Sequence, residues 1–267
     1  MPEPSLDKYG IFSELEEKCI VPNVLGRLSR GQQEALSLLA VTVSYCAEAF
    51  KNRRGVTPLG LSCALPAAQL RNFIMACMTA NAALEAEETN QRDPVVMELG
   101  YGTGLNLLAA KLVCYKAFTT GYEQDPLAQE FAGILEKVYG LKIDRKGGDF
   151  LAAHLAEASA DVIVNENIHT LLTWEPQLLA ARAARKAAHA KTLFVPGGMD
   201  FYLRTNDISF YMGRVDFGKV DSDSIRLAAE VPGNLIGRSV LISPMLLNHR
   251  MHPIFKNPGI EIGGIRQ

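Results

Sequence analysis

The sequence predicts the α/β class, with a doubly wound parallel sheet, an N-terminal helical cap and a short β-rich C-terminal region. Three observations lead to this prediction. Residues 93–203 alternate short apolar runs with helical periodicity, as strands and helices do around a parallel sheet. Residues 1–92 show helical periodicity alone. Residues 204–267 show short alternating runs that glycines and prolines interrupt.

Two amphipathic helices are expected in the N-terminal region. From Gln32 to Phe50 apolar residues recur at helical spacing, and a second such pattern begins near Pro66. The polar stretch 89–94 then predicts a linker to the central region. These helices either close over a ligand of the central region or complete its core, and the sequence does not decide between the two.

A glycine-rich turn stands at the start of the central region. An apolar run from Val95 to Leu99 is followed by three glycines at alternate positions and then by a helical pattern from Leu105 to Val113. Glycine lets the backbone bend sharply and lets a ligand lie against it, so this is a predicted nucleotide-binding turn. The G-x-G-x-x-G fingerprint of dinucleotide sites fails, because Leu105 and Leu107 stand where its last glycine would be. A G-x-x-x-x-G-K-[ST] loop is absent from the sequence as well.

An acidic residue follows the second expected strand. The run from Ala117 to Tyr122 ends at Glu123. A carboxylate at the tip of this strand can accept hydrogen bonds from both hydroxyls of a ribose, so Glu123 is the expected ribose ligand. The alternative is that Glu123 and Asp125 only favour the N-terminus of the helix expected from Leu127 to Tyr139.

The pattern Glu-x-Gly-x-Gly-x-Gly, from Glu98 to Gly104, resembles the first motif of class I S-adenosylmethionine-dependent methyltransferases. The resemblance implies a Rossmann-like fold and S-adenosylmethionine as the cofactor. It also implies that the turn surrounds the amino acid and ribose parts of the cofactor and that Asp149, after the third expected strand, contacts the adenine. The implied cofactor-binding residues are Glu98, Gly100, Gly102, Thr103, Gly104, Glu123 and Asp149.

The fourth expected strand spans residues 160–165, and the loop that follows it indicates the substrate. It lacks the Asp/Asn-Pro-Pro-Tyr/Phe sequence of methyltransferases that act on the amino groups of bases. Its glutamates Glu166 and Glu175 stand nine positions apart and resemble the double-glutamate loop of the protein arginine methyltransferases. That resemblance spans roughly residues 95–205 and implies that both glutamates bind and orient a guanidinium group. The alternative is that Glu166 only ends a strand and Glu175 only begins a helix.

The C-terminal region is expected to be an abridged barrel that binds the substrate. Beyond Phe201 there are 66 residues, fewer than the β-barrel and dimerisation arm of the resembled family need. His249 precedes the last expected strands, somewhat as the Thr-His-Trp loop of that family does, and is the third candidate catalytic residue. A surface or structural histidine is the alternative.

Composition limits the partners. A net charge of −2 argues against strong sequence-independent attraction to nucleic acid or to an anionic membrane. No signal peptide is recognisable and the apolar-rich run Ala35 to Ala47 is too short to span a bilayer, so a cytoplasmic location is expected. Five cysteines without a C-x-x-C pair indicate neither a disulfide framework nor a zinc site, and no metal is expected. The basic residues from Arg182 to Lys191 are expected on one alanine-rich helix, as a solvated face.

The sequence therefore predicts a methyltransferase that transfers to nitrogen, on a guanidinium group of a small molecule or of arginine. One alternative is an oxygen methyltransferase of secondary metabolism, with Glu166 or His169 as the base. Another is a partner subunit that binds the cofactor without chemistry of its own. The expected partners are a small-molecule or arginine-containing substrate and a second copy of the chain in a homodimer.

Overall fold

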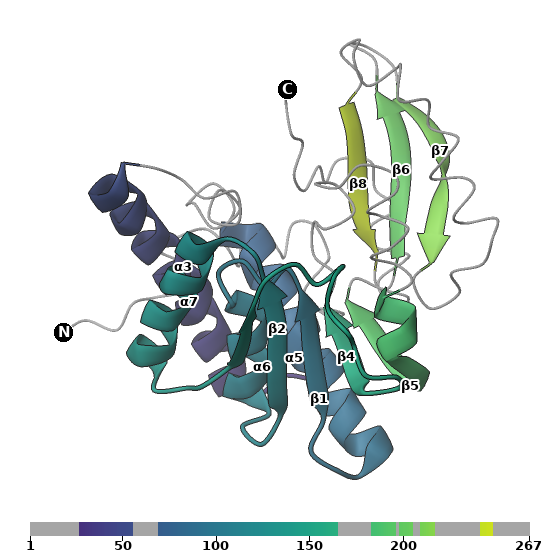
Figure 1. Cartoon of the computed structure of the whole chain (residues 1–267), viewed down its shortest axis with the longest axis horizontal. Helices are drawn as coiled ribbons and strands as arrows, with labels where there is room; N and C mark the ends of the chain where they lie inside the picture. The colour runs from purple at the N-terminus through teal and green to yellow at the C-terminus, as the bar shows by residue number, and fades with distance from the viewer. Residues whose placement is uncertain are drawn as a thin grey trace.

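The structure is a computed structural model and contains one parallel and one antiparallel sheet (Figure 1). The residues it describes are 27–55, 69–164, 183–195, 198–204, 209–216 and 241–247. The helices are α3 (Arg30–Arg54), α5 (Gln69–Asn90), α6 (Leu105–Val113) and α7 (Pro126–Tyr139). The strands are β1 (Val95–Leu99), β2 (Phe118–Glu123), β3 (Asp144–Gly147), β4 (Ala160–Val164), β5 (Ala188–Val195), β6 (Gly198–Arg204), β7 (Ser209–Asp216) and β8 (Leu241–Leu247).

The central sheet has five parallel strands in the order β3-β2-β1-β4-β5. The chain moves outward from β1 to β2 and β3, and then returns to the other side of β1 for β4 and β5. The prediction of a doubly wound sheet is confirmed. In such sheets ligands bind beyond the carboxyl ends of the strands, where the strand order reverses. Here that point lies between β1 and β4, next to the glycine turn that follows β1.

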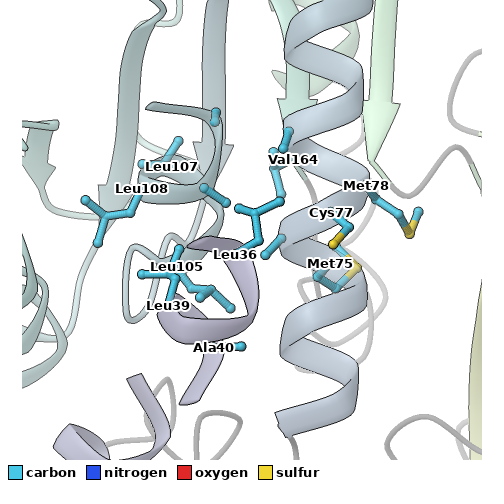
Figure 2. Close-up of a cluster of buried hydrophobic side chains, with 14 of the residues drawn as sticks. Leu36, Leu39, Ala40, Met75, Cys77, Met78, Leu105, Leu107, Leu108 and Val164 are labelled. Atoms are coloured by element: carbon cyan, nitrogen blue, oxygen red, sulfur yellow. The ribbon is translucent and has the colours of Figure 1, made fainter. Parts of the chain in front are cut away.

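Helices α3, α5, α6 and α7 pack on one face of the sheet. Helices α5, α6 and α7 follow one another across the strands from β5 to β3, and α3 packs outside them against α5 and α6. Figure 2 shows side chains of α3, α5 and α6 meeting Val164 of β4 in a continuous apolar cluster. The labelled members are Leu36, Leu39, Ala40, Met75, Cys77, Met78, Leu105, Leu107, Leu108 and Val164. The described N-terminal helices therefore complete the core.

The local sequence sets the limits of helix α3. Ser29 accepts a hydrogen bond from the N–H of Gln32, and the Gln32 side chain accepts one from the N–H of Ser29, which together form a capping box. Gly55 ends the helix in the left-handed conformation, with φ of 70°. Across the core, the rings of Phe50 and Phe131 meet edge to face at 5.6 Å between centroids, which fixes α3 against α7.

The opposite face of the sheet carries a smaller apolar cluster. Met97, Leu99 and Ile163 point to this side, because successive strand residues alternate between faces. Phe150 and Leu155 cover them from the turns that join β3 to β4. The remaining members are Ala160, Ala184 and Ala187.

The C-terminal part forms a separate antiparallel sheet with the strand order β7-β6-β8. This agrees with the β-rich region predicted there. The residue limits of the three predicted regions stay a prediction.

One local prediction is wrong. The alanine-rich sequence predicts a helix through His189 and Lys191, whereas strand β5 begins at Ala188. The reason is tertiary: β5 pairs in parallel with β4, and the Thr192 hydroxyl donates a hydrogen bond of 2.7 Å to the carbonyl of Ala160. Pairing with a buried strand outweighs the helix propensity of the alanines.

Candidate functional site

The turn after β1 is held in a left-handed conformation at three alternate positions. Gly100, Gly102 and Gly104 have φ of 72°, 50° and 75°, which residues with a Cβ rarely adopt. The N–H groups of Gly100 and Tyr101 both donate to the carbonyl of Tyr122, at 2.9 and 3.0 Å. The turn is thereby tied to the end of β2.

Neighbouring atoms also approach two of the glycines closely. A Cβ on Gly104 would lie 3.3 Å from the side chain of Ile143, besides straining the backbone. A Cβ on Gly121 in β2 would lie 2.9 Å from the ring of Tyr101 and 3.0 Å from the carbonyl of Glu98. Gly121 lets the Tyr101 ring pack beneath the turn, a role that the sequence analysis missed.

Glu123 joins three segments at the carboxyl edge of the sheet. One carboxylate oxygen, Oε2, accepts a hydrogen bond of 2.9 Å from the N–H of Gly102, and Oε1 accepts one of 2.8 Å from the N–H of Asp125. Its carbonyl accepts from the Gln129 side chain at 2.8 Å and from the N–H of Gly148 at 3.0 Å. The half-buried carboxylate is thus fixed against the glycine turn.

The geometry also bears on the alternative role of Glu123. Helix α7 is capped by Asp125, whose side chain accepts a hydrogen bond of 2.9 Å from the N–H of Leu127, with Pro126 in the first turn. Capping is therefore supplied by Asp125. The Glu123 carboxylate instead faces the glycine turn.

Glu98 is a buried carboxylate at the end of β1, with 3% of its surface exposed. The side-chain amide of Asn106, in the first turn of α6, donates a hydrogen bond of 2.7 Å to Glu98 Oε1. A buried charge is tolerated only when it is hydrogen-bonded, so Asn106 stabilises Glu98 under the turn. Thr103 is nearly buried, and its hydroxyl accepts a hydrogen bond of 3.3 Å from the N–H of Leu105.

Tyr101 connects the turn to β3. Burial raises the pKa of its hydroxyl, and the guanidinium of Arg145 partly offsets this shift. Arg145 is fixed in turn by helix α7: its Nε donates to Glu136 at 2.9 Å and its Nη1 donates to the carbonyl of Gln129 at 2.7 Å. The hydroxyl of Tyr101 therefore lies near a basic side chain that α7 holds in place.

Asp149 lies in the turn after β3 and is exposed. Its carboxylate accepts a hydrogen bond of 2.9 Å from the N–H of Leu151, which stabilises that turn. Its neighbour Gly148 has φ of 113° and donates to Glu123. Asp149 therefore stands at the same carboxyl edge as Glu123.

The structure thus brings one part of the predicted site together. The seven candidate cofactor-binding residues all lie at or just beyond the carboxyl ends of β1, β2 and β3. The three candidate catalytic residues, Glu166, Glu175 and His249, lie outside the described residues. His169, the alternative base, lies outside them too.

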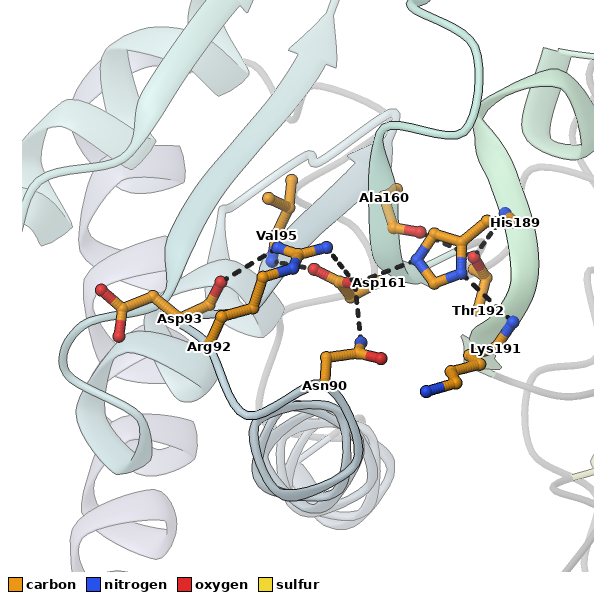
Figure 3. A network of polar contacts seen from close by, with 9 residues as sticks. All are labelled: Asn90, Arg92, Asp93, Val95, Ala160, Asp161, His189, Lys191 and Thr192. Atoms are coloured by element: carbon orange, nitrogen blue, oxygen red, sulfur yellow. Dashed lines mark hydrogen bonds and ion pairs between the residues drawn. The ribbon is translucent and has the colours of Figure 1, made fainter.

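A second polar cluster, which the sequence analysis missed, lies at the opposite edge of the sheet (Figure 3). Asp161 in β4 is fully buried. Its Oδ1 accepts hydrogen bonds from the side chains of Asn90 at 2.8 Å, Arg92 at 2.8 Å and His189 at 3.0 Å. Its Oδ2 accepts from the N–H of Val95 at 2.8 Å. Asp161 therefore fastens the end of α5, the start of β1 and the start of β5 together.

His189 has a defined tautomer in this cluster. Its Nδ1 accepts a hydrogen bond of 3.1 Å from the N–H of Lys191, so the neutral ring carries its proton on Nε2 and donates it to Asp161. The stretch 89–94, predicted to be a linker, is thus anchored by its own side chains. An aspartate inside an apolar strand is the signal that could have pointed to this cluster.

The described residues lack two features. Among them, no helix combines the length and the apolar character that a membrane span requires. In the same part of the chain, no three His, Cys, Asp or Glu side chains gather as a metal site would need.

No protein-family model matches the sequence, and no curated protein matches it. Solved structures do resemble the chain. The PRMT1 enzyme-prozyme heterotetrameric complex with AdoHcy from Trypanosoma brucei is 13% identical over 64% of this chain and 65% of that one, with a TM-score of 0.39. PKMT2 from Rickettsia typhi in complex with AdoHcy is 15% identical over 48% of this chain and 24% of that one, with a TM-score of 0.39.

The mitomycin 7-O-methyltransferase MmcR is 20% identical over 49% of this chain and 39% of that one, with a TM-score of 0.34. In each of the three, the matched part spans less than two thirds of the solved chain. The fold class itself rests on the strand order and the helix positions described above.

Proposed function

We propose that this chain binds S-adenosylmethionine and is a methyltransferase that transfers to a guanidinium nitrogen, on a small molecule or on arginine. One observation carries the cofactor assignment. The Glu123 carboxylate accepts a 2.9 Å hydrogen bond from the N–H of Gly102, inside a turn whose three alternate glycines all have positive φ. An acid at the end of the second strand is thereby fixed against a turn that has no side chain at those positions.

The donors and acceptors fit this cofactor. A carboxylate offers about four acceptor positions, and the described residues use two at Glu123, so two remain for the hydroxyls of a ribose. At Gly100, Gly102 and Gly104 no Cβ stands between the backbone and a ligand. The carboxyl group of Glu98 is buried beneath a turn that would receive a cationic cofactor.

Asp149 would contact the adenine, since it follows the third strand at the same edge. When bound, S-adenosylmethionine supplies a methyl group on a positively charged sulfur. In this proposal residues 93–203 bind the cofactor and residues 204–267 bind the substrate. The homodimer and the cytoplasmic location stay predictions.

The assignment of the acceptor rests on the sequence. A guanidinium stays charged at neutral pH and its nitrogen lone pair is delocalised, so it must be held and turned towards the methyl group. Glu166 and Glu175 would accept its N–H bonds and draw the charge to the far nitrogens. Catalysis would then come mainly from positioning and from charge compensation, with His249 as a further substrate contact.

Methyl transfer to arginine and to small guanidino compounds tests the acceptor. Glu166→Gln and Glu175→Gln should each lower the rate by about a hundredfold or more, because each removes a charge that holds the reacting group. Both should leave the affinity for S-adenosylhomocysteine unchanged. Glu157→Gln, at an exposed glutamate, is the control and should keep full activity.

Three results would contradict parts of this proposal. Transfer to a hydroxyl compound but to no guanidino compound would indicate an oxygen methyltransferase. Tight binding of S-adenosylhomocysteine without transfer to any acceptor would indicate a partner subunit. Full activity of both glutamine variants would remove the two glutamates from the mechanism.

A further inference from the structure

A groove of about 700 Å³ opens at the edge of the central sheet opposite the glycine turn. It runs between the end of α6, the first residues of β2 and the start of β3, with α7 as one wall. Because the strands are parallel, the first residues of β2 and β3 lie at the amino edge, whereas the glycine turn follows the carboxyl end of β1. The residues that matter for its chemistry are Lys111, Phe118, Thr119, Glu136, Lys142 and Arg145.

The carboxylates of the groove are already occupied. Glu136 accepts hydrogen bonds from Arg145 Nε at 2.9 Å and from the N–H of Ile143 at 2.7 Å. Asp144 accepts a hydrogen bond of 3.0 Å from the Thr120 hydroxyl and lies 3.6 Å from the Lys146 ammonium. Neither acid is left to balance the charge of the remaining cations.

Two ammonium groups of the lining have no carboxylate partner among the residues that the structure describes. Lys142 is exposed and forms no ion pair with another residue that the structure describes. Lys111 donates one hydrogen bond of 2.6 Å to the carbonyl of Ala117, and an ammonium has three donors. Both side chains therefore give the groove a positive potential.

The Thr119 hydroxyl supplies a second observation. Thr119 is one of the residues that line the groove, the residue is 2% exposed and its hydroxyl oxygen is buried. Among the described residues it has no hydrogen-bond partner. A buried polar group without a partner costs about 1 to 3 kcal/mol, so a polar ligand at this wall would be stabilising. At the rim, Phe118 is 52% exposed and offers an apolar surface.

We propose that this groove is a second binding site, for a nucleotide-sized molecule that joins a phosphate group to a flat ring. Lys111 and Lys142 would bind the phosphate, Phe118 would pack against the ring and Thr119 would hydrogen-bond to the ligand. The volume is in the range of small-molecule sites, about 300 to 1,000 Å³. The proposal does not depend on the cofactor site at the other edge of the sheet.

Calorimetric titration of uridine diphosphate into the full chain tests this site. Uridine is chosen because it lacks the adenine of the proposed cofactor. Lys142→Glu should weaken binding by about tenfold, because it reverses a charge next to the phosphate. Lys186→Glu, at an exposed lysine before β5, is the matched control and should bind as the wild type does. Thr119→Val should weaken binding too and keep the shape of the side chain.

Each of the remaining titrations distinguishes binding in the groove from another explanation. Uridine without phosphate should bind far more weakly, and equal binding would contradict the role of the lysines. Saturating S-adenosylhomocysteine should leave the titration unchanged, and competition would place the nucleotide in the cofactor site and overturn the proposal. Wild-type binding by Lys142→Glu, or no binding of uridine diphosphate by the wild type, would overturn it as well. The result does not depend on whether the chain binds the cofactor.

Discussion

The N–H of Gly102 donates a hydrogen bond of 2.9 Å to the carboxylate of Glu123, 21 residues further along the chain. This bond joins the turn after β1 to the end of β2, two neighbouring parallel strands. The hydrogen bonds of the chain itself therefore orient the acid. A ligand that binds there meets a formed site and does not have to order it, which favours affinity.

Gly121→Ala is predicted to destabilise the fold. The added Cβ would lie 2.9 Å from the Tyr101 ring and 3.0 Å from the carbonyl of Glu98, and the backbone cannot move away freely. We expect a loss of about 1 to 3 kcal/mol in the free energy of unfolding, measured in urea. Gly31→Ala is the control: nothing lies within 4 Å of its Cβ position, in the first turn of α3, so it should stabilise slightly. Equal stability of the two variants would contradict the close packing under the turn.

Gly104→Ala is predicted to weaken cofactor binding by more than its loss of folding stability would explain. An alanine held at this φ of 75° should lower the free energy of unfolding by about 1 to 2 kcal/mol, and its Cβ would alter the turn itself. Gly55→Ala has nearly the same backbone strain, with φ of 70°, and no atom within 4 Å. Gly104→Ala should lose at least as much stability as Gly55→Ala, while only Gly104→Ala should lose affinity for S-adenosylhomocysteine. If both keep wild-type affinity, the turn does not contact the cofactor.

Asp161→Asn is predicted to destabilise the chain by about 2 to 4 kcal/mol in urea unfolding. The amide cannot accept all four hydrogen bonds that the buried carboxylate accepts from Asn90, Arg92, Val95 and His189. Asp93→Asn changes a nearby exposed carboxylate and should cost less than about 0.5 kcal/mol. Because the cluster lies at the amino edge of the sheet, folded Asp161→Asn should keep its affinity for S-adenosylhomocysteine. An unfolding midpoint equal to that of the wild type would contradict the fastening role.

Stability is predicted to fall in mild alkali because of Cys114. Burial, with a smaller contribution from Glu87, raises the pKa of the Cys114 thiol from its ordinary value of 9.0 to about 11. Between these values the unfolded thiol has lost its proton while the folded thiol keeps it, so rising pH stabilises the unfolded state. The stabilising contribution of Cys114 to the free energy of unfolding is complete below about pH 9 and is lost as the pH approaches 11.

Urea unfolding under reducing conditions, from neutral pH to about pH 10.5, measures this effect. Cys114→Ala should lose less stability over the range than the wild type does, whatever its stability at neutral pH. Cys77 and Tyr101 also have raised pKa values through burial, so part of the dependence should remain in the variant. Identical pH dependence in both proteins would contradict the assignment to Cys114.

The glycine turn and Glu123 were predictable because their signals are local. Alternate glycines after an apolar run specify a strand, a turn and a helix, and an acid at the end of the next strand falls at the same sheet edge. The central strands and helices followed from the same periodicity. Helix α6 was predicted with the limits it has, from Leu105 to Val113.

The Asp161 cluster and the groove were not predictable in this way. The partners of Asp161 stand 28 to 71 residues away from it in the sequence, and only the sheet brings them together. His189 was expected on a helix because alanines surround it, and pairing with β4 made it part of a strand. The groove likewise combines the end of one helix with the starts of two strands.

Calorimetric titration of S-adenosylhomocysteine into the wild type, Glu123→Gln and Glu157→Gln tests the central claim most directly. The wild type and Glu157→Gln should bind alike. Glu123→Gln should bind about ten to a hundred times more weakly, because a hydrogen bond to a charged group contributes about 1.5 to 3 kcal/mol. Equal affinity of Glu123→Gln and the wild type, or no binding by the wild type, would contradict the proposed cofactor site.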